Sequence, residues 1–123
     1  MARITHFEIP ASDPERSMAF YTTVFGWTFQ RWGTEDYWIA ATGPENESGI
    51  NGAILLRRAP DMPVVNTLVV EDMDAAIERV EQNGGQIVVP KVTIPGMGYQ
   101  CYFKDPDGII HGMMMYDAQA GAS

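Results

Sequence analysis

Two side chains near the start of the chain, His6 and Glu8, are of types that carry proton-transfer chemistry. They occupy alternate positions of an extended segment, Ile4 to Ala11, so one face of a strand is expected to hold both. A carboxyl group beside an imidazole can act as a general base or can anchor a cationic ligand. Each residue also has an ordinary explanation, His6 as a hydrogen-bonded structural histidine and Glu8 as a group that meets solvent or a partner chain.

Three further side chains are candidates for contact with a ligand. Trp38 belongs to an aromatic group with Trp27, Trp32 and Tyr37, and it could stack on a planar or cationic compound or simply fill the core. Met114 alternates with Met113 and Met115, which predicts that it faces a cavity while they face a helix; ordinary core packing explains it equally well. Tyr99 follows the glycine-rich segment 95–98, which is expected to form a flexible rim. Cys101 is expected to be a buried, unreactive thiol.

The elements that must position these residues repeat once along the chain. A strand at 4–11, a helix opening at Asp13-Pro14, and strands at 27–32, 37–42 and 50–56 form the first set. A strand at 64–70, a helix at 72–83, and strands at 86–90, 98–103 and 109–116 form the second. Asp13 and Asp72 are separated by 59 residues, and Ile50-Asn51-Gly52 matches Ile110-His111-Gly112 at an offset of 60. Each half is too small to bury a sheet face well, so the two are expected to share a core.

Composition limits the classes of partner. The chain has 123 residues, 16 acidic against 8 Lys and Arg, and a formal net charge of −8. This charge argues against nucleic acid or an anionic membrane as a partner. The single cysteine excludes an internal disulfide and a cysteine-built zinc site. No apolar run reaches about 18 residues, and the first residues lack the apolar core of a signal peptide. A cytoplasmic location is expected.

The order of the segments and several short phrases resemble the vicinal oxygen chelate superfamily, which includes glyoxalase I, bleomycin- and fosfomycin-resistance proteins and extradiol dioxygenases. The resemblance covers about residues 4–116 and is greatest to small glyoxalase-like bacterial proteins. The matching phrases are Phe7-Glu8-Ile9-Pro10, Asp13-Pro14-Glu15-Arg16 with Phe20-Tyr21 and Phe25-Gly26-Trp27, Gly84-Gly85, and Lys104-Asp105-Pro106-Asp107-Gly108.

The resemblance implies an α+β fold of one domain: two βαβββ modules that form a curved mixed sheet around a cavity, with helices outside. Module one is expected at about 3–57, a connector at 58–63, module two at about 64–117 and a frayed tail at 118–123. A homodimer is expected, because members of this superfamily usually pair and sheet edges need covering.

The metal-using families take their ligands from four equivalent positions, which the resemblance places at His6, Gly52, Val65 and Gly112. Only His6 offers a donor atom there, so no cofactor is expected. A divalent Zn, Ni, Mn or Fe ion would require relocated ligands. The two glycines and Val65 predict a larger, more apolar cavity, also lined by Trp38, Tyr99 and Met114.

Three functions are compatible with this pattern. The first is metal-free binding of a small aromatic or cationic molecule. The second is a metal-independent lyase or isomerase that uses Glu8 or His6 as its acid–base group. The third is a glyoxalase- or dioxygenase-like metalloenzyme with relocated ligands. A fold relationship alone does not choose among them.

Overall fold

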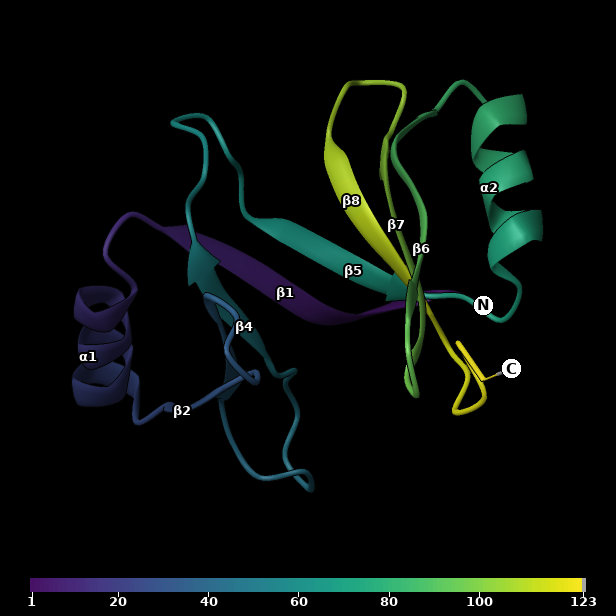
Figure 1. Cartoon of the computed structure of the whole chain (residues 1–123). Helices are drawn as coiled ribbons and strands as arrows, with labels where there is room; N and C mark the ends of the chain where they lie inside the picture. Colours follow the sequence, from purple (N-terminus) through teal and green to yellow (C-terminus); the bar gives the residue numbers. More distant parts are fainter. Residues whose placement is uncertain (123) are drawn as a thin grey trace. The chain divides into compact units, whose positions relative to one another are not determined.

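The computed structural model describes residues 1–122, and within this range it contains two helices and eight strands (Figure 1). Contacts divide these residues into two compact units. The first unit is Thr5–Val65; the second is Asn66 onward, together with Met1–Ile4. The element order is strand, helix and three strands, twice over, so the predicted fold class, α+β with two βαβββ modules, is confirmed.

The first unit is a mixed four-stranded sheet with one helix. Its sheet has the strand order β2-β3-β4-β1, in which β1 and β4 are parallel and the other neighbours are antiparallel. The elements are β1 (Arg3–Ala11), α1 (Pro14–Phe25), β2 (Thr28–Arg31), β3 (Tyr37–Ala41) and β4 (Gly52–Leu56).

Local signals set both ends of α1. Asp13 caps its start, where the carboxylate accepts a hydrogen bond from the Arg16 backbone N–H at 3.2 Å, and Pro14 occupies the first turn. Gly26 ends the helix in the left-handed conformation, with φ of 75°, which an L side chain rarely adopts. The helix thus begins at the Asp13-Pro14 signal from which the sequence predicts it.

Aromatic rings connect α1 to one face of its sheet. The Phe7 ring on β1 packs against Trp27 with 5.6 Å between ring centroids, and Trp27 stacks on Tyr21 of α1 at 4.7 Å. Phe7 therefore marks the face that carries α1. Because side chains alternate along a strand, the neighbours of Phe7 on β1 point to the opposite face.

The second unit repeats the plan with the strand order β5-β8-β7-β6, and β5 and β8 are parallel. Helix α2 lies against this sheet (Figure 1) and is capped by Asp72, which accepts from the Ala75 backbone N–H at 3.1 Å. Met73, Cys101 and Met113 form the buried core between helix and sheet. The elements are β5 (Val65–Val69), α2 (Met73–Gln82), β6 (Gln86–Ile94), β7 (Gly98–Lys104) and β8 (Ile110–Tyr116).

Two segments of the second unit differ from expectation. Strand β6 continues past Pro90 to Ile94, and its pairing with β7 shifts register on either side of Val89. Proline is tolerated there because β6 is the outer strand of this order and is irregular. The predicted frayed tail at 118–123 is ordered at Ala120, which is 3% exposed and whose carbonyl accepts from the Gly96 backbone N–H at 2.9 Å; Ser123 lies outside the described residues. Residues 95–97 thus form a tight turn before β7, which this contact ties to the C-terminal segment.

Candidate functional site

Strand β1 presents His6 and Glu8 on the face of the first unit's sheet that lies opposite α1, since both alternate with Phe7. Pairing extends this face across the sheet: Glu8 is level with Ala53 on β4, and Ala53 is level with Ile39 on β3. The two chemically active side chains of the sequence therefore share one face, as predicted from the alternation of β1.

His6 has a specific partner on this face. Its Nε2 lies 2.8 Å from the Tyr37 hydroxyl oxygen, which joins β1 to β3 across β4. The imidazole is partly buried, and burial holds the pKa of His6 below its ordinary value of about 6.5, although the nearby Glu8 carboxylate opposes the shift. His6 is therefore expected to be neutral at pH 7.

Glu8 is a buried acid. Its residue is only 6% exposed, and its level neighbour Ala53 is fully buried. A carboxyl group in such a place must be satisfied by hydrogen bonds, because an unpaired buried charge is costly. Glu8 does take part in interactions within the molecule. The sheet face opposite α1 thus carries the buried Glu8 carboxyl group and the hydrogen-bonded pair of His6 and Tyr37.

Two predicted cavity residues of the first unit lie on the α1 side of the sheet instead. Gly52 is on this side, since a β-carbon there would fall 2.5 Å from the Phe7 ring. Trp38 pairs with Ile54, which lies two residues after Gly52 on β4 and therefore on the same face. The Arg31 guanidinium lies 5.2 Å from the centroid of the Trp38 ring. Neither residue shares a sheet face with His6 and Glu8.

The predicted match of Gly52 with Gly112 is one residue out of register. Glu8 pairs with Ala53 on β4, and Thr67, which follows Glu8 by 59 residues, pairs with Gly112 on β8. The counterpart of Gly112 is therefore Ala53, at the same offset of 59 that separates the two helix caps. A slip of one residue in a strand moves a side chain to the other face, which is why Gly52 lies beside Phe7.

Along the strands β5 and β8, Val65, Gly112 and Met114 share the sheet face opposite α2. Gly112 pairs with Thr67, and Met114 pairs with Val69, while Met113 and Met115 pack on the α2 side as predicted. Thr67 is 3% exposed, and its hydroxyl oxygen has no hydrogen-bond partner among the described residues. Tyr99, in contrast, packs against the α2 core, with Lys91 5.3 Å from its ring centroid.

The glycines do not enlarge a cavity. The space that a side chain would occupy is filled at Gly52 by the Phe7 ring and at Gly112 by Thr67 and Tyr102. The missing side chains allow neighbouring strands to bring these groups close together. The prediction that the glycines widen the site is therefore wrong.

The resemblance offers four positions for metal ligands, and three of them lack a side-chain donor atom. Val65, Gly112 and Ala53, the true counterpart of Gly112, carry no donor atom, and Nε2 of His6 already engages Tyr37. Among residues 1–122, no group of three or more His, Cys, Asp and Glu side chains is placed to hold a metal.

Cys101 lies in the buried core of the second unit, and His111 pairs with a turn carboxylate. Cys101 is fully buried beneath α2, and burial raises the pKa of its thiol. His111 Nε2 lies 3.3 Å from the Asp105 carboxylate, which also accepts from the Asp107 and Ile109 backbone N–H groups and so shapes the turn between β7 and β8.

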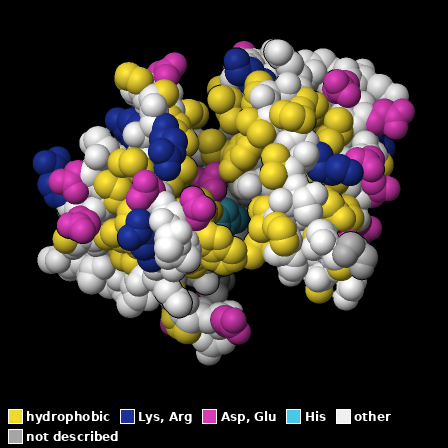
Figure 2. Space-filling view, in the orientation of Figure 1, with side chains coloured by type: hydrophobic (Ala, Val, Ile, Leu, Met, Phe, Trp, Pro, Cys, Tyr) yellow, Lys and Arg dark blue, Asp and Glu magenta, His cyan; other side chains and the backbone are white. Residues whose placement is uncertain are grey.

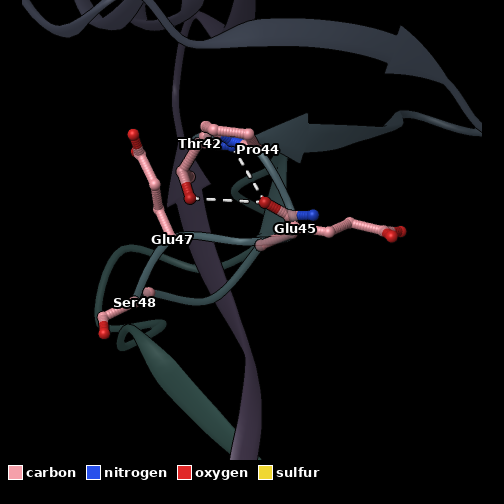
Figure 3. Close-up of a pocket in the computed structure, with 8 residues that line it drawn as sticks. Thr42, Pro44, Glu45, Glu47 and Ser48 are labelled. Atoms are coloured by element: carbon pink, nitrogen blue, oxygen red, sulfur yellow. Dashed lines mark hydrogen bonds between the residues drawn. The ribbon is translucent and has the colours of Figure 1, made fainter.

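A small pocket lies in the loop between β3 and β4 (Figure 3). Its volume is about 100 Å³. The Asn51 side chain, which lines it, accepts hydrogen bonds from the Thr42 backbone N–H and hydroxyl. Organic ligands usually occupy pockets of about 300–1,000 Å³. The polar lining and the small volume make this a loop feature rather than a site for such a ligand.

The molecule was compared with known proteins. A family model described as glyoxalase/bleomycin resistance protein/dioxygenase superfamily matches residues 3–110. A putative glyoxylase, CFP32, of Mycobacterium tuberculosis is 27% identical over 94% of this chain, which spans about half (46%) of that relative's length. A glyoxylase-like domain-containing protein of Didymella fabae is 29% identical, with 90% of this chain and 91% of the relative covered.

Solved structures agree at the level of the fold. A superfamily member from Vibrio splendidus superimposes with a TM-score of 0.67 at 17% identity, over 95% of this chain and all of that one. Neither helix of the described residues is long and apolar enough to cross a membrane. With the family model matching from Arg3 to Ile110, the chain belongs to the glyoxalase/bleomycin resistance protein/dioxygenase superfamily.

Proposed function

We propose that the chain binds a small organic molecule, aromatic or cationic, without a metal, on the sheet face of the first unit that carries His6, Glu8 and Tyr37. The observation that supports this most directly is the buried Glu8 on the same face as the His6–Tyr37 pair. Buried polar groups in an apolar setting are what orients a ligand in most small-molecule sites. The Tyr37 ring supplies an aromatic contact on this face. Trp38 cannot supply one there, because it lies on the α1 side of the sheet.

The test is a ligand-observed NMR screen of aromatic and cationic compounds against the intact chain, followed by variants. We expect hits to weaken in His6→Gln and Glu8→Gln. Trp38→Phe is the matched control, because Trp38 lies on the other sheet face, and it should retain the hits. Hits that survive both β1 substitutions, or a screen without hits, would contradict the proposal.

A second candidate function is a metal-independent enzyme that uses Glu8 or His6 as its acid–base group. The neutral His6 beside a carboxyl group favours it, and two relatives carry the word glyoxylase in their names. Glu8→Gln separates the two candidates. An enzyme should lose turnover of a carbonyl substrate while still binding it, whereas a binding protein shows no turnover in either form.

We also propose that the chain acts in the bacterial cytoplasm as a homodimer. The acidic net charge of −8 favours solubility, and apolar side chains reach the surface (Figure 2), among them Phe20, Val24 and Phe25 of α1, which are more than half exposed. Sedimentation velocity should give about twice the mass of one 13.6 kDa chain. A single species at the mass of one chain would contradict the dimer.

A further inference from the structure

Helix α1 leaves large apolar side chains in contact with water. No residue of α1 is buried, and Phe20, Val24 and Phe25 are 55%, 53% and 61% exposed. We propose that these three side chains, which we call the α1 patch, form the centre of the surface through which two copies of the chain associate. This inference rests on the homodimer of the proposed function and adds the location of its interface.

The repeat supplies a comparison within the same chain. At the offset of 59 residues that relates the two helix caps, the counterparts of Phe20, Val24 and Phe25 are Arg79, Asn83 and Gly84, and all six residues are exposed. A helix on the surface of a soluble protein turns polar side chains to water, and α2 follows this rule. The α1 patch departs from it at the same three positions. Contact with water therefore does not explain the patch, whereas contact with another surface does.

The α1 patch is continuous and has the size of an interface core. Phe20 and Val24 lie one helical turn apart, and the centroids of the Phe20 and Phe25 rings are separated by 6.4 Å. With about 200 Å² for a whole aromatic residue, the exposed fractions amount to roughly 300 Å² per chain. Two copies give roughly 600 Å² of apolar area, which is the share expected in an interface of about 1,000 Å². This area is enough for a reversible dimer.

Charge points to a second copy of the chain as the partner. Two chains with a net charge of −8 repel each other, and the repulsion is smallest where the facing surfaces hold no charge. Residues 17–30, which include the α1 patch, contain no charged side chain. A two-fold interface brings the same surface against itself, and an uncharged apolar surface is complementary to itself. A membrane is a poorer match, because helices that lie on membranes are usually rich in Lys and Arg, and α1 has Arg16 alone.

The repeat also suggests the substitution that tests the interface. Phe20→Arg gives α1 the residue that α2 exposes at the corresponding position, so the far-UV circular dichroism spectrum should be unchanged. A dimer through the α1 patch would then bury one unpaired charge from each chain, which is strongly unfavourable. In sedimentation velocity over a range of concentrations, we expect the dissociation constant of the dimer to rise by about a hundredfold. Val24→Lys is a second variant with the same expected effect. Val92→Arg is the matched control, because Val92 is 49% exposed on β6, and it should retain the dimer.

The outcomes distinguish this inference from the proposed function. A dimer that persists in both α1 variants, or that Val92→Arg weakens equally, would overturn the α1 interface and leave the proposed homodimer standing. A wild-type chain that stays monomeric would overturn both, and its binding to phosphatidylcholine vesicles, lost in Phe20→Arg, would identify a membrane as the occupant of the patch. The ligand screen tests the opposite sheet face independently, so its hits should be the same in Phe20→Arg and in the wild type.

Discussion

Replacing Gly112 with Ala should destabilise the second unit. A β-carbon at this position would lie 2.6 Å from the Thr67 hydroxyl oxygen and 3.3 Å from a ring carbon of Tyr102. Both partners would have to move, and Thr67 is β-branched and 3% exposed, so it has few alternative rotamers. Overpacking of this kind costs about 1–3 kcal/mol. Because only side chains and no backbone atoms obstruct the new carbon, we expect a loss of about 1–2 kcal/mol.

A second substitution identifies the cause. Thr67→Ala removes the obstructing hydroxyl and methyl groups, so the double variant Gly112→Ala/Thr67→Ala should be more stable than the sum of the single effects predicts. A coupling of about 1 kcal/mol is expected, since residues in contact commonly couple by about 0.5–3 kcal/mol. The cycle isolates the contact between these two positions from any general effect of either substitution.

Urea unfolding followed by circular dichroism measures these changes. With a slope of about 1–3 kcal/mol per molar urea, a loss of 1.5 kcal/mol lowers the midpoint by roughly 0.5–1.5 M. Gly43→Ala is the matched control, because the nearest atom to its new carbon is the Glu47 carboxylate at 3.8 Å; its stability should change by less than about 0.5 kcal/mol. A Gly112→Ala protein as stable as this control, or additive single effects, would refute the close approach of Thr67.

Three further predictions concern the helices and His6. Asp72→Ala should cost about 1 kcal/mol in urea unfolding and Asp72→Asn much less, because the amide oxygen can still cap α2; equal losses would argue against the cap. Gly26→Ala should cost about 1 kcal/mol, since an L side chain is strained at φ of 75°, and an unchanged midpoint would contradict this. The lowered pKa of His6 means that the unfolded chain takes up this proton first, so stability should fall as pH drops below about 6.5. His6→Gln should flatten that fall in urea midpoints measured between about pH 7 and pH 5; an equal slope would show that His6 is not its source.

Local signals made the elements predictable from the sequence. Asp13, Pro14 and Gly26 act within one or two turns of the chain, and α1 begins and ends where they indicate. Strand β6 extends beyond Pro90, its predicted end. A proline is tolerated in an edge strand, and the sequence does not show that β6 is the last strand of its order.

The site was less predictable because it depends on pairing between distant strands. Alternation along β1 correctly groups His6 with Glu8, yet it cannot tell which residue of β4 is level with Glu8. The parallel pairing chooses Ala53, and the one-residue difference transfers Gly52 to the α1 side. The pairing of β3 likewise brings Tyr37 to His6 and sends Trp38 to the other face. No spacing in the sequence indicates the His6–Tyr37 bond, since 31 residues separate the partners.

The fully buried thiol of Cys101 gives the molecule a built-in reporter. It is the only cysteine of the chain, and it lies where Met73 of α2 meets β7 and β8. A thiol reagent can reach it only when α2 separates from the sheet. The labelling rate at low reagent concentration therefore reports how often this opening occurs. Ligand binding, by contrast, is proposed for the first unit, which has no thiol. Labelling with and without ligand would therefore reveal whether occupancy of one unit changes the opening of the other.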